Sequence, residues 1–233
     1  MQDIVAFIFA RGGSKGLSNK NILNFAGKPL IAWSIEQALS NSRINRIIVS
    51  TDSPKIAEIA LKFGAEVPFL RPTELASDNA PELLAWKHAL MYLAEMEGRI
   101  PEIFLSLPCT SPLRSQTDID ANLNCLISNN ADLAICVTPS KRSPFFNIIQ
   151  LNNDGEVQRI LAEKSYIRRQ DVPSTFDITT IAYSGFSKYI LETPDVFSGK
   201  IFASQASADR AIDIDSELDF RIAEFLFEKA RFQ

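Results

Sequence analysis

The sequence predicts an α/β fold in which a mainly parallel, mixed sheet is sandwiched between helices. Short apolar runs rich in β-branched residues recur along the 233-residue chain, and amphipathic segments with cap or turn residues lie between them. This alternation is typical of sheets whose strands are mostly parallel and buried on both faces. The expected strands are Ile4–Phe9, Arg46–Thr51, Ile103–Leu107 and Leu133–Thr138.

Helices are expected between and after these strands. Ser53 suits an N-cap, Pro54 suits the first helical position and Gly64 suits a terminator, so one helix is expected within this segment. Ser216 is the expected N-cap of the last helix, with Asp219 as its partner at the third helical position. The other helical patterns cover about Leu30–Leu39, Pro81–Glu97, Thr117–Ser128 and Glu217–Lys229.

A different pattern occupies residues 140–176 and predicts an inserted β excursion. Asn152-Asn-Asp-Gly155 has the composition of a hairpin turn and lies between the apolar stretches Phe145–Leu151 and Val157–Leu161. No internal repeat, low-complexity tract or composition break divides the chain. We therefore expect one domain over residues 1–233, with the excursion as part of it.

Composition excludes several classes of protein. A chain with 46% hydrophobic and 22% charged residues is typical of a soluble globular protein. The first apolar run, Ile4–Ala10, is too short for a transmembrane helix and has no basic segment before it. Three cysteines without CxxC spacing argue against a disulfide framework and a zinc site. The net charge of −4 and the lack of a basic block argue against nucleic-acid binding. Because the first apolar run fits neither a membrane span nor a signal peptide, we expect a cytoplasmic protein.

A glycine-rich turn, Ala10-Arg-Gly-Gly-Ser-Lys-Gly16, follows the first expected strand. At the carboxyl end of a parallel strand, such a turn lets backbone N–H groups approach a phosphate closely. Its spacing fits neither the P-loop nor G-x-G-x-x-G. Between Arg11 and Ile35 there are four basic residues and no acidic one, although the chain as a whole is acidic. The segment predicts an anion site, with a structural turn or a solvated basic face as the alternatives.

Asp213 and Asp215 form a second candidate site near the end of the chain. One residue separates them, so on an extended segment both carboxylates lie on one side while Ile212 and Ile214 face the core. Two converging carboxylates suit Mg²⁺, which prefers oxygen ligands and often bridges to substrate phosphates. On spacing alone, paired acidic residues before a helix also fit a favourable interaction with the helix dipole.

Seven segments, in order across nearly the whole chain, resemble the CMP-sialic acid synthetase (acylneuraminate cytidylyltransferase) family. They are Ala10-Arg-Gly-Gly-Ser-Lys-Gly-Leu-Ser-Asn-Lys-Asn21, Gly27-Lys-Pro-Leu30, Val49-Ser-Thr-Asp-Ser53, Arg71-Pro-Thr-Glu-Leu-Ala-Ser-Asp78, Thr110-Ser-Pro-Leu-Arg114, Arg169-Gln-Asp-Val-Pro173 and Ile212-Asp-Ile-Asp215. The resemblance implies a Rossmann-like nucleotidyltransferase fold. It also implies transfer of CMP from CTP to the anomeric hydroxyl of an acidic keto-sugar, a sialic acid-like nonulosonic acid, with release of pyrophosphate.

The same resemblance implies roles for individual residues. The CTP phosphates and part of the cytidine would be surrounded by Arg11, Ser14, Lys15, Lys20 and Asn21. The cytosine and ribose pocket would be formed by Arg71, Ser77 and Ala80. The expected catalytic residues are Arg11, Lys20 and Asp215, and the expected ligands of Mg²⁺ are Asp213 and Asp215. The sugar would be bound by Thr110, Ser111, Arg169 and Gln170.

In this family the excursion implies a homodimer with a shared active site, so a second copy of the chain is the expected macromolecular partner. Two segments depart from the sialic acid members. Pro108-Cys109 replaces their usual Gln-Pro, and Phe176–Gly185 lacks their Tyr-x-x-Asn-Gly-Ala string. Both lie where the sugar would bind. Legionaminic or pseudaminic acid, an eight-carbon Kdo-like acid, and a non-catalytic nucleotide-binding role therefore stay open as alternatives.

Overall fold

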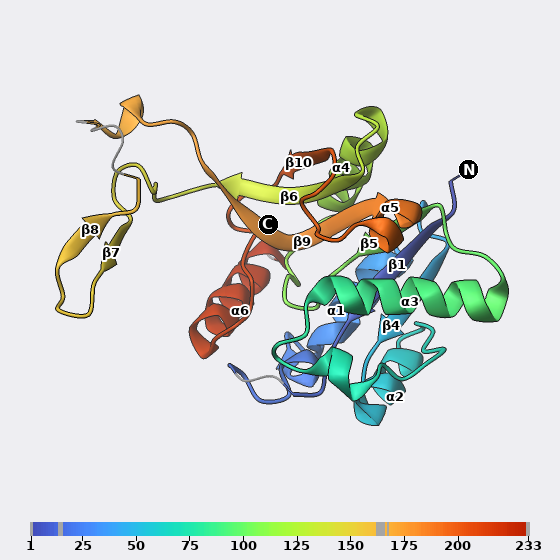
Figure 1. Ribbon diagram of the computed structural model, residues 1–233. Coiled ribbons are helices and arrows are strands. Elements are labelled where there is room, and N and C mark those ends of the chain that lie inside the picture. Colours follow the sequence, from blue (N-terminus) through green and yellow to red (C-terminus); the bar gives the residue numbers. More distant parts are fainter. Residues whose placement is uncertain (1, 14–15, 162–165, 167, 232–233) are drawn as a thin grey trace.

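The computed structural model describes residues 2–13, 16–161, 166 and 168–231, and its centre is a six-stranded sheet (Figure 1). The strand order is β10-β6-β9-β5-β1-β4. The strands are β1 (Ile4–Phe9), β4 (Arg46–Ser50), β5 (Ile103–Ser106), β6 (Leu133–Pro139), β9 (Phe176–Phe186) and β10 (Ile201–Gln205). Only β9 runs antiparallel to its neighbours, so the sheet is mainly parallel and mixed, as predicted.

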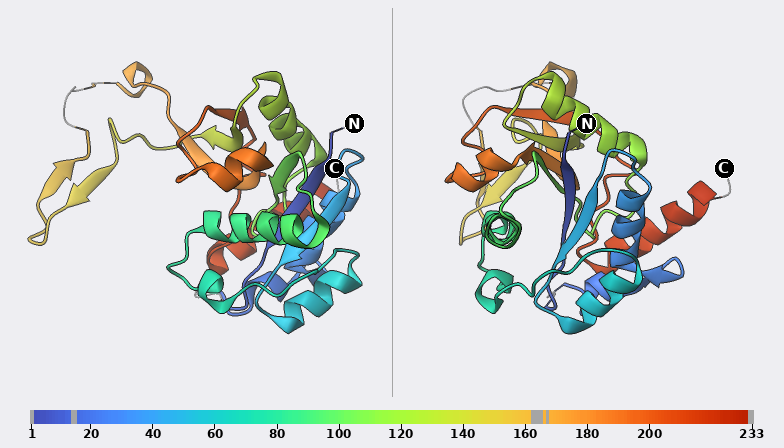
Figure 2. Two further views of the ribbon diagram at one scale, coloured as in Figure 1. Left: turned by 45° about the vertical axis from the view of Figure 1, so that its right-hand side comes forward. Right: turned by 90° about the vertical axis from the view of Figure 1, so that its right-hand side faces the viewer.

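Helices cover both faces of this sheet (Figure 2). The α-helices are α1 (Leu30–Leu39), α2 (Pro54–Lys62), α3 (Glu82–Glu97), α4 (Gln116–Ser128), α5 (Ser187–Glu192) and α6 (Glu217–Arg231), and the short strands β2 (Asn24–Phe25) and β3 (Lys28–Pro29) precede α1. Apolar side chains of α1, α2 and α4 pack on one face of the sheet, and those of α3 and α5 on the other. All five expected helices form. Four of them pack their apolar stripes on the sheet, and α6 packs instead against Phe25, Leu30 and Ile214.

Local cap chemistry sets several helix starts. The Ser53 hydroxyl accepts a hydrogen bond from the Ile56 N–H at 3.4 Å, with Pro54 at the first helical position. At α6 the predicted partnership holds, because the Ser216 N–H donates to the Asp219 carboxylate at 2.8 Å. Within the described ranges, no helix combines the length and the apolar character that a membrane crossing requires.

The excursion leaves the sheet after β6 and returns as β9. We call residues 140–175 the arm. Its hairpin, β7 (Ile149–Leu151) and β8 (Val157–Arg159), pairs only within itself and stands away from the helices and the sheet in Figure 1. Since β6 and β9 are the two ends of one excursion, they meet as antiparallel neighbours. This explains why one strand opposes the others, and the sequence patterns did not identify this eleven-residue strand.

A half-buried ion pair joins α4 to the segment that precedes α6. Arg210 donates to both carboxylate oxygens of Asp118, at 2.8 and 3.0 Å, and the Ser115 N–H donates to the same carboxylate at 2.9 Å. Burial alone would raise the pKa of Asp118, but the hydrogen bonds from Arg210 and Ser115 outweigh it and lower that pKa. The pair therefore stabilises the fold and fixes the chain a few residues before Asp213.

We expect Arg210→Gln to lower the free energy of unfolding by about 2 kcal/mol at pH 7, less than for a fully buried pair because Arg210 is partly exposed. The lowered pKa of Asp118 means that this contribution is present above about pH 4 and is lost as the pH falls through the folded value. Urea unfolding at several pH values measures it. Arg221→Gln, which breaks an exposed pair with Glu217, is the control and should cost at most about 0.5 kcal/mol. Equal effects of the two variants would contradict the role of Asp118.

Candidate active site

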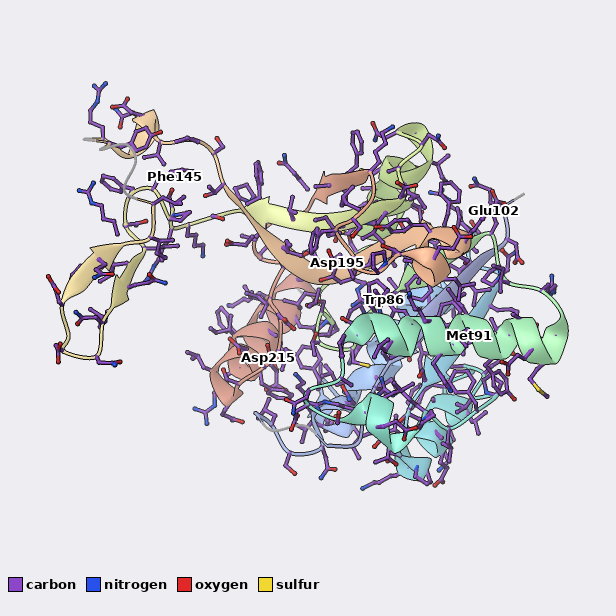
Figure 3. The ribbon with its side chains drawn as sticks, in the orientation of Figure 1. Trp86, Met91, Glu102, Phe145, Asp195 and Asp215 are labelled. Carbon is purple, nitrogen blue, oxygen red and sulfur yellow. The ribbon has the colours of Figure 1, made fainter. Side chains whose placement is uncertain are left out.

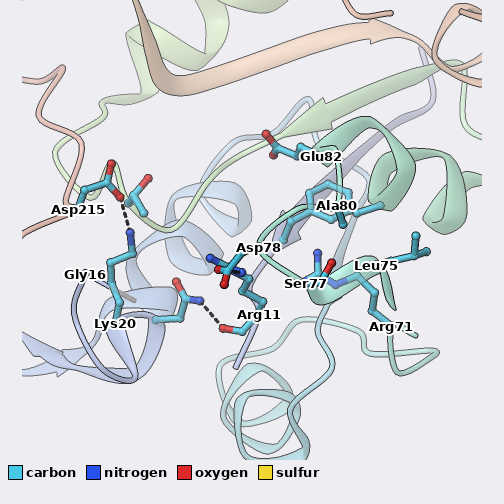
Figure 4. Close-up of a pocket in the computed structure, with 14 residues that line it drawn as sticks. Arg11, Gly16, Lys20, Arg71, Leu75, Ser77, Asp78, Ala80, Glu82 and Asp215 are labelled. Atoms are coloured by element: carbon cyan, nitrogen blue, oxygen red, sulfur yellow. Dashed lines mark hydrogen bonds and ion pairs between the residues drawn. The ribbon is translucent and has the colours of Figure 1, made fainter. Parts of the chain in front are cut away.

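A cavity of about 550 Å³ lies at the carboxyl ends of β1 and β5 (Figure 4). Ligands bind at this edge in open α/β sheets. The residues of the sequence-based assignment that line it are Arg11, Lys20, Asn21, Arg71, Ser77, Ala80, Thr110 and Asp215. Ser14 and Lys15, which belong to the same assignment, lie outside the described residues. The structure thus gathers residues from distant parts of the sequence around one cavity.

The glycine-rich turn is held in place by backbone and side-chain hydrogen bonds. The Gly12 N–H donates to the Asp52 carboxylate at 2.8 Å, which ties the turn to the end of β4. The buried Asn21 side chain donates to the Arg11 carbonyl at 3.0 Å, across the loop from η1 (Lys20–Ile22). These bonds fix the loop, so that its cationic side chains reach the cavity from a defined backbone.

Both described cations of this loop are balanced by carboxylates. The Arg11 guanidinium lies 2.5 Å from the Asp78 carboxylate, and the Lys20 ammonium lies 2.7 Å from that of Asp215. Asp78 comes from the loop before α3, and Asp215 comes from the segment before α6. Partly exposed ion pairs of this kind contribute little to stability. Arg11 and Lys20 could therefore leave these carboxylates and bind a polyanionic ligand at a small cost in free energy.

Arg71 is buried, and its guanidinium is incompletely paired. Its Nε and one terminal nitrogen have no hydrogen-bond partner among the described residues. Burial lowers the pKa of Arg71, while the nearby carboxylates of Asp52 and Glu82 oppose that shift. Because a buried N–H without an acceptor costs free energy, a ligand that offers an acceptor at this end of the cavity would be stabilising.

The Asp213–Asp215 segment has the predicted alternation. Ile214 is buried, Ile212 packs against the same cluster, and the Ile214 N–H donates to the Thr110 carbonyl at 2.9 Å. Burial and the nearby charge of Asp215 raise the pKa of Asp213, against hydrogen bonds from Thr110 and Thr180. One Asp213 carboxylate oxygen is buried without a hydrogen-bond partner in the described part of the chain. These carboxylates fit a divalent cation.

The structure separates the residues assigned to the sugar. Thr110 lines the cavity, whereas Ser111 is buried and its hydroxyl shares a 2.7 Å hydrogen bond with that of Thr180. Arg169 and Gln170 lie on η3 (Arg169–Asp171) of the arm, and Gln170 lines a different hollow at the base of the arm. Figure 3 shows this separation, because Phe145 marks the arm far from Asp215. Gln170 is therefore not among the residues that line the cavity of its own chain, and η3, which carries Arg169, belongs to the arm.

Sequence reasoning did not identify Phe9, Leu75, Asp78, Glu82 and Ala85 as residues of this cavity. The available signal was their place in the chain, since they flank the glycine-rich turn or lie between Arg71 and the first turns of α3. These five residues complete the apolar and acidic parts of the lining.

The single histidine is outside the cavity lining. His88 packs edge-on against Phe69 at 5.0 Å, and burial lowers its pKa. This packing favours a structural role for His88, on the α3 face that meets Phe69.

An open α/β sheet with a cationic glycine-rich turn and paired carboxylates at the strand ends defines a nucleotide-binding enzyme. The model of the cytidylyltransferase family matches residues 5–231, so the chain belongs to this family. It is a CTP-dependent nucleotidyltransferase and transfers a CMP group from CTP to an acceptor.

Relatives of known name are similar over almost their whole length. The chain is 36% identical to the post-translational flagellin modification protein B of Campylobacter coli, over 100% of this chain and 98% of that protein. It is 37% identical to the CMP-N,N'-diacetyllegionaminic acid synthase of Campylobacter jejuni, over 97% and 95% respectively. A CMP:2-keto-3-deoxy-manno-octonic acid synthetase solved with CTP has the same fold, with a TM-score of 0.73, 16% identity, and coverage of 98% of this chain and 99% of that chain.

Gly16 gives a direct test of how closely the turn and the Asp215 segment approach each other. A Cβ atom at Gly16 would collide with the Asp215 backbone carbonyl, so one of the two segments must move. We expect Gly16→Ala to weaken CTP binding by about tenfold or more, measured by calorimetry, because the geometry of several charged contacts changes together. Gly98→Ala, at the C-cap of α3 and outside the cavity lining, is the control for a glycine substitution and should leave CTP affinity unchanged. Unchanged CTP affinity in Gly16→Ala would show that the approach of the two segments is unimportant for binding.

Proposed function

We propose that the CMP group is transferred to the anomeric hydroxyl of a nonulosonic acid, a sialic acid-like keto-sugar, with release of pyrophosphate. The main support is the meeting of the cationic turn with the Asp213–Asp215 segment in one cavity. The relative from Campylobacter jejuni is a CMP-N,N'-diacetyllegionaminic acid synthase, which supports a sugar acid of this class as the acceptor. Among nonulosonic acids, legionaminic acid is therefore the first to test.

In this proposal the phosphates lie against the turn. Arg11 and Lys20 bind phosphate oxygens and stabilise the negative charge that develops on the α-phosphoryl group and the leaving pyrophosphate. Each gives up its present carboxylate partner, Asp78 or Asp215. Arg71, Ser77 and Ala80 hold the cytosine and ribose at the other end of the cavity, where Arg71 offers unpaired N–H groups. The sequence also assigns Ser14 and Lys15 to the set of residues that bind the CTP phosphates.

We further propose that Asp213 and Asp215 hold Mg²⁺. No cluster of three or more His, Cys, Asp or Glu side chains suited to a metal occurs in the described ranges, so substrate phosphates and water would complete the coordination. When bound, the ion would supply charge neutralisation at the phosphates. The buried, unpaired oxygen of Asp213 supports this proposal.

The protein's main contribution to the reaction is positioning. The loop and Arg71 fix the two ends of CTP, and the sugar hydroxyl approaches the α-phosphorus from the side of Thr110, which lines the same cavity. Its oxygen forms the new bond to phosphorus as the bond to pyrophosphate breaks, and its proton passes to a base or to water. Arg11 and Lys20 need not move a proton in this scheme, because their role is electrostatic.

Asp215→Asn should lower turnover by about 100-fold or more at saturating Mg²⁺, because it removes charge from the proposed metal site. Pyrophosphate release from CTP and a panel of nine- and eight-carbon keto-sugar acids measures it, with mass spectrometry of the CMP-sugar. Asp209→Asn, at an exposed position of the same segment, is the control and should keep full activity. Near-normal turnover of Asp215→Asn would remove Asp215 from the site. A wild-type protein that forms no product across the panel would overturn the proposed function.

We also propose that the chain forms a homodimer through the arm, with a shared active site. The arm exposes large apolar side chains on its paired strands, including Leu151 and Val157, which are 65% and 60% exposed. Exposed apolar groups of this kind favour a protein partner. A neighbouring cavity would also give Arg169 and Gln170 a sugar to bind, as the sequence suggested.

We place the enzyme in the cytoplasm, where its free thiols would stay reduced.

The dimer proposal is tested by Val157→Asp. A charge in the middle of an apolar interface is costly to bury, so the wild type should be a dimer and the variant a monomer in light scattering after gel filtration. Leu61→Asp is the control, because Leu61 is 59% exposed on α2, away from the arm, and its substitution should leave the dimer intact. A monomeric wild type, or a dimeric Val157→Asp, would exclude the arm as the interface.

A further inference from the structure

One acidic side chain of the cavity has no part in the scheme above. Glu82 is the first residue of α3 and lines the cavity, with its carboxyl group directed into it (Figure 4). The Trp86 indole N–H, one helical turn further on, donates to one carboxylate oxygen at 3.1 Å. This bond fixes the rotamer of Glu82. No hydrogen bond to its second oxygen is found among the described residues, so that oxygen can accept one from a ligand.

The surroundings of Glu82 strengthen any hydrogen bond that it makes. Although the residue begins a helix and is exposed as a whole, burial of its carboxyl group raises the pKa, against the effects of Trp86 and Arg71. The Trp86 ring packs 5.7 Å from that of Tyr183 on β9, and burial also raises the pKa of Tyr183. Hydrogen bonds in such weakly polar surroundings are stronger, and unmade ones cost more, than in water.

The charge of Glu82 restricts what it can face. The triphosphate and the sugar carboxylate are both anionic, and the cations that suit them are Arg11 and Lys20 on the turn. A carboxylate accepts hydrogen bonds and repels anions, so the part of the substrate beside it must be a neutral N–H or O–H. On CTP, the donors are the amino group of cytosine and the ribose hydroxyls. On a sugar acid, they are hydroxyl and amide groups.

We propose that Glu82 is a specificity-determining residue that accepts a hydrogen bond from a neutral donor, either the cytosine amino group or a hydroxyl or amide group of the sugar acid. Where the donor is a group of the sugar acid, the inference rests on the proposed function. The first source would separate CTP from UTP, because uracil has a carbonyl oxygen where cytosine has its amino group, and a carboxylate repels that oxygen. Arg71, close enough to Glu82 for their charges to interact, would supply donors to the remaining acceptors of the base.

The test is Glu82→Gln, which keeps the size of the side chain and an oxygen for Trp86 but adds an N–H donor. If cytosine is the partner, the ratio of CTP to UTP affinity, measured by calorimetry, should fall by about tenfold or more. If the sugar is the partner, that ratio stays constant. The wild type should then discriminate by about tenfold or more in kcat/KM against a sugar acid that lacks one hydroxyl or acylamino group, and the variant should lose this discrimination.

Glu95→Gln makes the same chemical change at an exposed position of α3 and should alter neither ratio. Thermal unfolding of each variant checks that it folds. Two results would overturn the proposal. One is that Glu82→Gln changes neither the CTP-to-UTP affinity ratio nor the discrimination between sugar acids. The other is that it weakens affinity and kcat/KM equally for all of these substrates, which would show that Glu82 has a structural role only. Glu82→Asp is a second test variant. It keeps the negative charge and should therefore retain the preference for CTP or for the sugar acid better than Glu82→Gln. Turnover of CTP and a sugar acid by the wild type supports the proposed function separately, whatever Glu82→Gln does.

Discussion

The active-site region depends on the contact between two charged segments from opposite ends of the sequence. The cationic turn after β1 meets the Asp213–Asp215 segment so closely that Gly16 has no room for a Cβ atom beside the Asp215 carbonyl. Lys20 and Asp215 form an ion pair across the same contact. Neither segment would hold its charges in this arrangement alone. Since the pair is partly exposed, it adds little to stability and does not prevent an exchange of partners with an anionic ligand.

The sheet topology explains how the second segment reaches this position. The excursion sends the chain out after β6 and returns it as β9, which occupies the middle of the sheet between β5 and β6. Strand β9 brings Thr180 beside Ser111 and Tyr183 beside Trp86. After β10, the bidentate bond between Arg210 and Asp118 fixes the chain to the start of α4. The last extended segment then passes Thr110 and enters α6. The arm and the site are therefore two consequences of one topological feature.

The sequence predicted the parts of the fold whose signals are local. Apolar runs such as Ile4–Phe9, and caps such as Ser53 and Ser216, act within a few residues and were read correctly. Strand β9 was missed because its first residues are exposed and its polar residues, Thr179 and Thr180, interrupt the apolar run that identifies a buried strand. Its place in the sheet is set by the connection to β6, which is a long-range property. The cavity residues show the same limit: charge density and motif order indicated Arg11 and Asp215, but the role of Glu82 depends on a helix start meeting the cavity.

The structure shows what replaces the sialic acid members' motifs at Pro108-Cys109 and in Phe176–Gly185. Pro108 stands where those members usually carry Gln, and its carbonyl accepts hydrogen bonds from Arg114 and, at 3.1 Å, from the Ser34 hydroxyl. The position thus serves the packing of α1 against the strand end and offers no side-chain amide to a ligand. The Thr110 and Thr180 hydroxyls, 3.4 Å apart, stand near the Asp213 carboxylate, and Glu82 adds an acceptor on the α3 side of the cavity. Of these groups, Thr110 and Glu82 line the cavity, where they present a hydroxyl and a carboxylate and no side-chain amide. The cationic turn after β1 and the Thr110, Thr180 and Glu82 positions come from different segments of the chain, so one set can change while the other stays constant.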